Sequence, residues 1–236
     1  MQNSNPKASR HPQAKIIGVD IVEGQFDPPT IEDTDGQLLT KPNITWRVPN
    51  SPHGPPIDFD DEHWDLGDAL FDYIRLGHLT GSVRDWPELL TKTFHHLTPA
   101  NGYVEIMDID WQARSANGRV PANSPFAEYW DRLQNASERQ GCPFRLPRNM
   151  DDILESVGFD NIVHQRHRLP LTAWSHDTRQ FELGKWMRAF LEDSLEAFGV
   201  GLMTEQLHFS AEQVRARVRA CVEYAADPRN RVFVTL

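Results

Sequence analysis

The strongest constraint on this chain is a strand–turn–helix pattern over residues 69–87. Residues 69–76 are mostly apolar or aromatic and include the β-branched Ile74, which predicts a buried strand. The small residues of 77–81 predict a tight turn, and an amphipathic helix is expected over 83–97. In an open α/β sheet, the turn after such a strand lies at the edge where ligands bind.

The rest of the chain extends this pattern. Further strands are expected over 15–20, 43–48, 103–109, 159–169 and 231–236. Further helices are expected over 125–140, 148–157, 177–198 and 210–226. Residues 22–42 contain adjacent prolines and a turn sequence, which predict a loop. This alternation predicts an α/β fold with a mostly parallel sheet and an antiparallel end.

Length and composition narrow the domain organisation and the partners. We expect a single domain over 15–236, preceded by a disordered polar tail over 1–14. The net charge of −10 and the isoelectric point near 5.4 argue against nucleic acid or an anionic membrane as a partner. No apolar run approaches the ~20 residues that cross a bilayer, so no membrane span is expected.

The compartment follows from the cysteines and from the first residues. Cys142 and Cys221 are far apart and outside any metal-ligand spacing, which is typical of idle thiols in a reducing compartment. The N-terminal residues lack the apolar core of a secretory signal. We therefore expect an intracellular protein, in the cytoplasm or the nucleus.

Three polar residues stand near the expected ligand edge of the sheet. Asp20 ends the strand over 15–20, where a carboxylate can accept both ribose hydroxyls, although a helix cap or a loop acid would look the same. His78 follows the central strand and is a candidate general base for a substrate hydroxyl, or else a surface histidine. Glu105 could accept a proton or orient a substrate, or cap a loop. The histidine pairs lack metal-ligand spacing, so no metal site is expected.

Aromatic residues supply the candidate walls of a substrate pocket. Trp86 opens the helix over 83–97, and Trp130 belongs to an aromatic stripe in the helix over 125–140. That stripe is typical of a core, and a pocket lid is the alternative. Tyr103 begins the strand over 103–109 and is a candidate hydrogen-bond donor to a substrate.

A family resemblance appears when these pieces are taken in order. The chain resembles the fungal LaeA-like methyltransferase family over roughly residues 11–236. The likeness rests on the following segments: Ile17-Gly18-Val19-Asp20, Asn43-Ile44-Thr45-Trp46, the acidic run that ends at Trp64, Phe71-Asp72-Tyr73-Ile74, Gly81-Ser82-Val83-Arg84-Asp85-Trp86-Pro87, Tyr103-Val104-Glu105, Asp108-Ile109-Asp110, Leu154-Glu155-Ser156-Val157-Gly158-Phe159 and Gly184-Lys185-Trp186.

The resemblance implies a class I, Rossmann-like sheet that binds S-adenosylmethionine at the carboxyl ends of its strands. It implies that Asp20 holds the ribose and that Asp58 lies near the adenine. The turn at Leu76, Gly77 and His78 would line the pocket where methyl donor and acceptor meet. Members of the family are tied to fungal secondary metabolism, as tailoring enzymes or as regulators.

One part of the family pattern is missing from this sequence. The family's first strand and its glycine-rich loop precede the second strand, but the fourteen residues before Lys15 contain no glycine and no strand pattern. We therefore expect an incomplete sheet in which the second and fourth strands lose their shared neighbour. Because unpaired central edges are costly, another element or a second copy must cover them, or the strand lies outside this sequence.

Three functions follow as hypotheses. The first is methyl transfer from S-adenosylmethionine to a hydroxyl of a small molecule. The second is a cofactor-independent cyclase or pericyclase that folds its substrate in an apolar cleft, with His78, Tyr103 or Trp86 as hydrogen-bonding groups. The third is a non-catalytic regulatory relative. Binding of S-adenosylmethionine separates the first from the other two.

Overall fold

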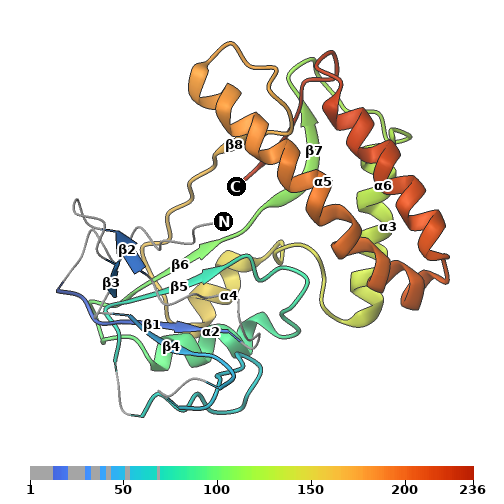
Figure 1. Ribbon diagram of the computed structural model, residues 1–236. Helices are drawn as coiled ribbons and strands as arrows, with labels where there is room; N and C mark the ends of the chain where they lie inside the picture. The colour runs from blue at the N-terminus through green and yellow to red at the C-terminus, as the bar shows by residue number, and fades with distance from the viewer. Residues whose placement is uncertain (1–12, 21–29, 33–37, 41–43, 51–53, 68–69) are drawn as a thin grey trace. The chain divides into compact units, whose positions relative to one another are not determined.

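A computed structural model describes residues 13–20, 30–32, 38–40, 44–50, 54–67 and 70–236 (Figure 1). These residues belong to two compact units, 1–69 and 70–236, which we call the first and the second unit and describe separately. The predicted α/β class is confirmed, since both strands and helices are present. Most of the expected tail over 1–14 lies outside the described residues.

The first unit contains two small sheets. β1 (Ile16–Val19) pairs in parallel with β4 (Ile44–Arg47), as the sequence predicted for two strands of one sheet. Gly18 allows the Trp46 ring to lie directly on the β1 backbone, because a Cβ at Gly18 would meet that ring at 2.2 Å. β2 (Thr30–Glu32) pairs antiparallel with β3 (Leu38–Thr40). The prediction of a loop over 22–42 was therefore wrong at these six residues, where backbone pairing overrides the turn-rich composition.

Arg47, the last residue of β4, forms hydrogen bonds and an ion pair with the acidic segment of the first unit. The Arg47 guanidinium donates to the carbonyls of Pro55 and Asp65, both at 2.9 Å. It also pairs with the Asp65 carboxylate at 3.2 Å. The Arg47 side chain is 12% exposed, whereas the Asp65 side chain is 77% exposed and stays in contact with solvent. The segment that carries Asp58 is thus held by side-chain chemistry rather than by strand pairing.

The second unit contains two sheets, and a strand of the first sheet continues almost directly into a strand of the second. β5 (Tyr73–Gly77) pairs in parallel with β6 (Tyr103–Met107). β6 leads through two residues into β7 (Asp110–Ser115). β9 (Val232–Thr235) lies antiparallel between β7 and β8 (Arg168–Pro170), which confirms the predicted antiparallel end.

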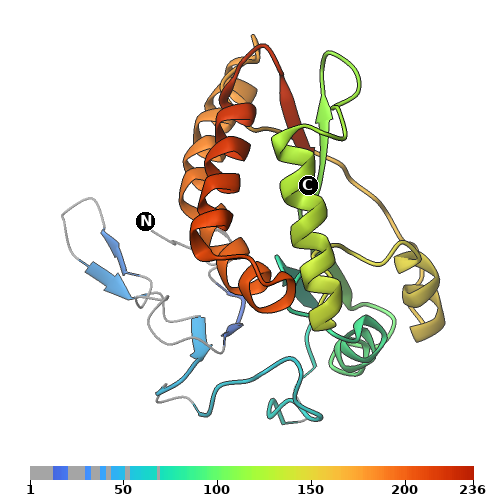
Figure 2. The ribbon, with the colours of Figure 1, turned by 90° about the vertical axis from the view of Figure 1, so that its right-hand side faces the viewer.

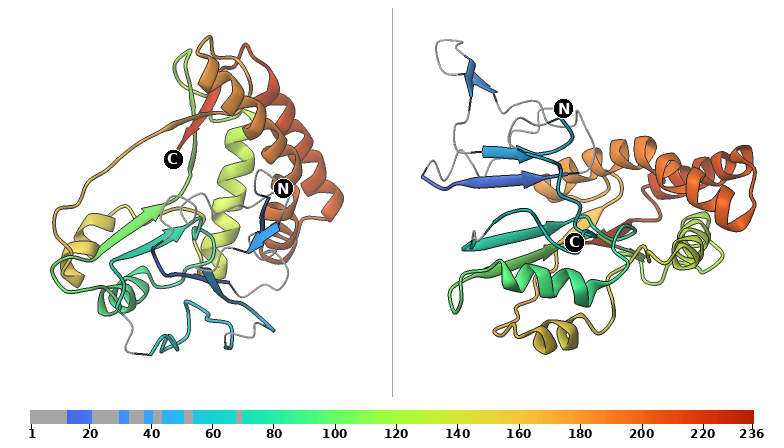
Figure 3. Two further views of the ribbon diagram at one scale, coloured as in Figure 1. Left: turned by 60° about the vertical axis from the view of Figure 1, so that its left-hand side comes forward. Right: turned by 90° about the horizontal axis from the view of Figure 1, so that it is seen from below.

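Helices cover these strands in two groups. α2 (Trp86–His95) packs against α4 (Met150–Val157) beside β5 and β6 (Figure 3). α3 (Pro125–Gln140), α5 (Thr178–Leu207) and α6 (Ala211–Ala226) lie side by side as a helical layer next to β7 and β9 (Figure 2). The largest buried cluster of the second unit lies in this layer and includes Phe126, Leu133, Leu191, Leu195 and Val214.

Local capping chemistry explains where the helices begin and end. The side chains of Asp85, Ser124 and Asp177 each accept a backbone N–H at a helix start. Gly158 ends α4 with a φ of 117°, which a residue with a side chain rarely adopts. Ser210 begins α6, and Gln213 at the third helical position closes a capping box with it.

Several predicted boundaries were also wrong. β5 spans 73–77 rather than 69–76, and it is not buried on both faces, since Tyr73 is 43% exposed. Of the strand predicted over 159–169, only its last two residues are paired as β8, because the exposed polar side chains before them have no face to bury. α5 continues to Leu207, nine residues past the prediction, because Met203 still packs into the core.

Each parallel pair of strands lies within one unit. Among the described strands, β1 pairs with β4 alone in the first unit, and β5 pairs with β6 alone in the second. A search of the described helices finds none long and apolar enough to cross a membrane.

Candidate active site

The turn that follows β5 carries the predicted base. His78 is exposed and adopts a φ of 59°, in the left-handed region that few residues with a side chain enter. Its backbone N–H donates to the Met107 carbonyl at 2.9 Å, which extends the β5–β6 ladder by one residue. Unusual backbone conformations of this kind cluster at functional sites, because the surrounding structure must maintain them.

Asp108 holds this turn in place. Its carboxylate accepts the Thr80 N–H at 2.8 Å and the Thr80 hydroxyl at 2.7 Å. It also accepts the backbone N–H of Ile109 at 2.8 Å. Thr80 is 7% exposed, so the loss of the carboxylate would leave two buried donors without an acceptor. Asp108 therefore positions the turn rather than serving as a free base.

Replacing Asp108 with alanine is expected to destabilise the protein by about 2 kcal/mol, because the Thr80 donors lose their acceptor. A thermal melt should show a drop in Tm of about 4–8 °C for a unit of this size. Asp110→Ala is the matched control, since Asp110 is half-exposed and pairs with Arg114 at the surface. Equal losses for the two variants would contradict the clamping role.

An aromatic cluster begins directly on the turn. The Phe144 ring lies against Gly81, where an added Cβ would stand 2.5 Å from the ring, and Gly81 has a φ of 87°. The Gly81 N–H also donates to the Pro143 carbonyl at 3.0 Å. We call Phe144 and the four rings that continue from it the aromatic cluster; the other members are Trp111, Trp130, Phe190 and Phe198.

The geometry of the aromatic cluster is that of stacked and tilted rings. Trp111 and Trp130 stack with centroids 4.5 Å apart and planes 9° from parallel. Phe190 lies parallel to Trp111 at 6.0 Å, and Phe198 lies 5.3 Å from Phe144. The two tryptophans are buried, whereas the three phenylalanines are partly exposed. The cluster thus has a buried floor and a partly open rim.

The core behind the aromatic cluster is electrically neutral. Burial raises the pKa of the Tyr129 phenol, and the neighbouring Cys221 adds to this shift. Burial also raises the pKa of the Cys221 thiol. The Tyr129 hydroxyl donates to the Leu195 carbonyl in α5. Both groups therefore stay protonated at neutral pH, and neither offers a nucleophile or a charge.

The other predicted site residues of β5 and β6 lie at different positions along the two strands. Leu76 and Gly77 end β5, next to His78. Tyr103 is paired with Tyr73 at the opposite, amino end of the strands, so the structure does not bring Tyr103 to His78. Glu105 accepts a bond from the Tyr73 hydroxyl and pairs with Arg75 at 3.2 Å, which makes it a cross-strand tie.

The two tryptophans predicted to line a substrate pocket lie in different surroundings. Trp130 lies in the floor of the aromatic cluster. Trp86 is buried in the first turn of α2, at 5% exposure, and contacts no ring of the cluster among the described residues. The structure places one of the pair, Trp130, beside the turn at Gly81 through Phe144.

Two predicted residues belong to the first unit. Asp20 directly follows β1, and its backbone N–H donates to the Arg47 carbonyl at 3.3 Å. Asp58 accepts the Asp60 N–H at 2.9 Å, while its own N–H donates to Asp61 at 3.3 Å. Asp20 thus stands at the carboxyl end of a parallel strand, and Asp58 shapes a turn of the acidic segment.

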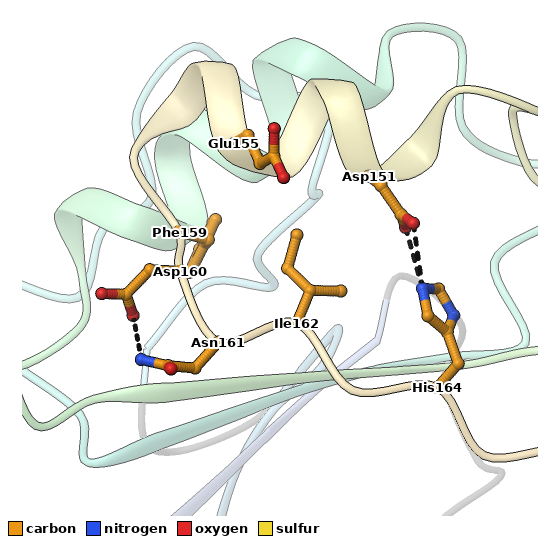
Figure 4. Close-up of a pocket in the computed structure, with 7 residues that line it drawn as sticks. All are labelled: Asp151, Glu155, Phe159, Asp160, Asn161, Ile162 and His164. Atoms are coloured by element: carbon orange, nitrogen blue, oxygen red, sulfur yellow. Dashed lines mark hydrogen bonds and ion pairs between the residues drawn. The ribbon is translucent and has the colours of Figure 1, made fainter.

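A separate surface pocket of about 510 Å³ lies between α4 and the segment after it (Figure 4). It is lined by Asp151, Glu155, Phe159, Asp160, Asn161, Ile162 and His164. Nε2 of His164 pairs with the Asp151 carboxylate at 3.0 Å. No predicted site residue lines this pocket. Among the described residues, no group of three acidic, histidine or cysteine side chains could hold a metal ion.

Four members of the aromatic cluster and the Asp108 clamp were missed by the sequence prediction. Trp111 lies two residues after the end of the strand predicted over 103–109, and that position was a usable signal. Phe190 was assigned only to the apolar face of a helix. Phe144 lies in a loop, where no periodicity marks it, and its contact with Gly81 spans more than sixty residues of sequence.

The chain is similar to known proteins that contain a methyltransferase domain. The model of a methyltransferase domain matches residues 7–165. A secondary metabolism regulator LAE1 of Cochliobolus heterostrophus is 30% identical over 92% of this chain and 63% of its own length. A regulator laeA of Fusarium oxysporum is 32% identical over 68% of this chain and 52% of its own length. A methyltransferase pytC of Aspergillus terreus is 31% identical over 61% of this chain and 44% of its own length.

The matched segments thus span roughly half to two thirds of these relatives. The domain match covers most of the chain, and it includes β1, β4, β5 and β6. The resemblance inferred from the sequence motifs is confirmed. The chain belongs to the methyltransferase domain family, among its LaeA-like, class I members.

Proposed function

We propose that this chain is a methyltransferase of fungal secondary metabolism that moves a methyl group from S-adenosylmethionine to a hydroxyl of a small molecule. The observation that carries the proposal is the turn after β5, which presents His78 and continues through Phe144 into the aromatic cluster. The similarity to a methyltransferase pytC supports the reaction class.

Each group of the second unit has a task in this proposal. S-adenosylmethionine supplies an electrophilic methyl group on a sulfonium sulfur. The His78 imidazole takes the proton of the acceptor hydroxyl, so that the oxygen becomes nucleophilic. The aromatic cluster orients the acceptor and excludes water, and Asp108 fixes the turn that carries His78.

The residues present fit part of the cofactor. Asp20 ends a parallel strand, as a ribose-binding carboxylate does, and Asp58 would lie at the adenine end.

Titration of the purified full chain with S-adenosylmethionine by calorimetry tests the proposal. We expect micromolar binding, and we expect Asp20→Ala to weaken it by roughly tenfold or more, which is the loss of one charge-assisted pair of hydrogen bonds. Asp60→Ala is the matched control, because Asp60 is an exposed acid of the same unit. No binding by a protein that melts cooperatively would refute methyl transfer.

A cofactor-independent cyclase is the second candidate. It is favoured by the aromatic cluster, whose apolar rings begin at the turn that carries His78. A cyclase needs a shaped apolar surface and one or two donors, which the aromatic cluster and His78 provide. A non-catalytic regulatory role is the third candidate. It is favoured because several relatives are named as secondary metabolism regulators. Failure of the purified chain to bind S-adenosylmethionine would exclude methyl transfer and leave these two candidates.

A further inference from the structure

We propose that the aromatic cluster binds a planar conjugated molecule with a hydrogen-bond acceptor, and that Nε1 of Trp130 donates to that acceptor. This inference deepens the proposed function by naming the chemical class of the methyl acceptor, and for that role of the ligand it rests on the proposed function. The binding itself can be measured without the cofactor.

The rim of the aromatic cluster supplies the stacking surface. Phe144 lies 5.3 Å from Phe198, which lies 6.1 Å from Phe190, and Phe190 is 38% exposed. These ring separations are those of offset and tilted aromatic pairs, in which a further flat ring finds favourable contacts. Contiguous apolar surface that reaches the solvent marks ligand-binding grooves and other interaction sites, whereas scattered single residues do not.

The floor of the cluster supplies an unused donor. Trp130 is 8% exposed, and its indole Nε1–H has no hydrogen-bond partner in the part of the chain that the structure describes. A buried donor without an acceptor is destabilising, so natural proteins retain few of them. An acceptor on a ligand that enters past the Phe144–Phe198 pair would satisfy this N–H. A hydrogen-bond donor without an acceptor, in an otherwise apolar floor, favours a ligand that carries a carbonyl or an ether oxygen.

The size of the rim argues for a small molecule rather than a protein. A stable protein interface buries about 800 Å² on each partner. Three partly exposed phenylalanines offer far less, and the next exposed aromatic on α5, Trp186, contacts no ring of the cluster among the described residues. The rim also adjoins Gly81, at the ligand edge of the β5–β6 sheet.

The test uses the purified full chain without S-adenosylmethionine and three probes, each titrated by calorimetry. The probes are 2-acetylnaphthalene, 2-isopropylnaphthalene, which lacks the acceptor, and 2-acetyldecahydronaphthalene, which is saturated and not flat. We expect 2-acetylnaphthalene to bind about three- to tenfold more tightly than either analogue, because each analogue loses one of the two interactions. Equal binding of all three probes, or no binding, would overturn the proposal.

Substitutions test whether the probes bind at the aromatic cluster. Phe144→Ala is expected to weaken 2-acetylnaphthalene by about fivefold or more, whereas Trp186→Ala, an exposed aromatic of the same layer, should leave it unchanged. Trp130→Phe keeps a ring and removes the N–H, so it should abolish the preference for 2-acetylnaphthalene over 2-isopropylnaphthalene. If Phe144→Ala fails to melt cooperatively, Phe190→Ala at the exposed rim takes its place. A loss with Trp186→Ala alone would place the ligand elsewhere and refute the site.

The outcomes separate this inference from the proposed function. Probe binding without S-adenosylmethionine binding would leave the aromatic site standing and remove methyl transfer. S-adenosylmethionine binding without any probe preference would leave the proposed function standing and remove the planar-acceptor inference.

Discussion

Replacing Gly184 with alanine is expected to destabilise the protein by about 3 kcal/mol, the upper end of the range for overpacking a core. α5 crosses the segment before it so closely that an added Cβ would stand 2.3 Å from the Thr172 carbonyl oxygen and 2.6 Å from its carbon. These are backbone atoms, which cannot rotate away as a side chain can. A thermal melt should show a drop in Tm of about 6–12 °C.

Gly201→Ala is the matched control, because Gly201 lies in the same helix and nothing stands within 4 Å of its added Cβ. Alanine has the higher helix propensity, so this variant is expected to stabilise the protein by about 0.5–1 kcal/mol. Opposite signs for the two substitutions would confirm the close crossing of α5 over Thr172. Equal effects would show that helix propensity, and not the crossing, decides the stability at Gly184.

Replacing His78 with asparagine is expected to lower kcat by about 100-fold with little change in KM, the lower end of what a general base contributes. Asparagine enters the left-handed region more readily than most residues, so the turn with its φ of 59° is retained. The measurement is transfer of a labelled methyl group from S-adenosylmethionine to any phenol that the unmodified chain methylates.

His176→Asn serves as the control for the His78 substitution, since His176 is exposed in the loop before α5. It should leave both kcat and KM unchanged. A rise in KM with an unchanged kcat for His78→Asn would assign His78 to substrate binding instead of proton transfer. Full activity of His78→Asn would remove the histidine from the mechanism.

The parts of the fold that could be predicted are those fixed by neighbouring residues. The helix over 125–140 was predicted with its observed ends from one local pattern, the recurrence at helical spacing of Phe126, Tyr129, Trp130 and Leu133. Asp85, which caps α2, and Gly158, which ends α4, also act on neighbouring residues. His78 could be placed at the tip of a strand because a turn must follow β5 there.

The parts that could not be predicted depend on contacts far apart in sequence. β7 was missed because Gln112, Arg114 and Ser115 look like a polar link, and pairing with β9 makes them a strand. Phe144 belongs to the site because its ring contacts Gly81, and no local sequence pattern predicts a contact between residues so far apart. Glu105 looked like a free acid, but Arg75 and Tyr73 on the neighbouring strand engage it.

The position of β9 has a consequence for how the second unit forms during synthesis. β9 is the middle strand of its sheet, so neither β7 nor β8 has its ladder partner until residue 235 has left the ribosome. The pairing of Ser115 with Val232 closes a loop of more than a hundred residues, which slows folding. Until then, the edge of β7 that pairs with β9 lacks its partner, and an unpaired strand edge is a template for pairing with other chains.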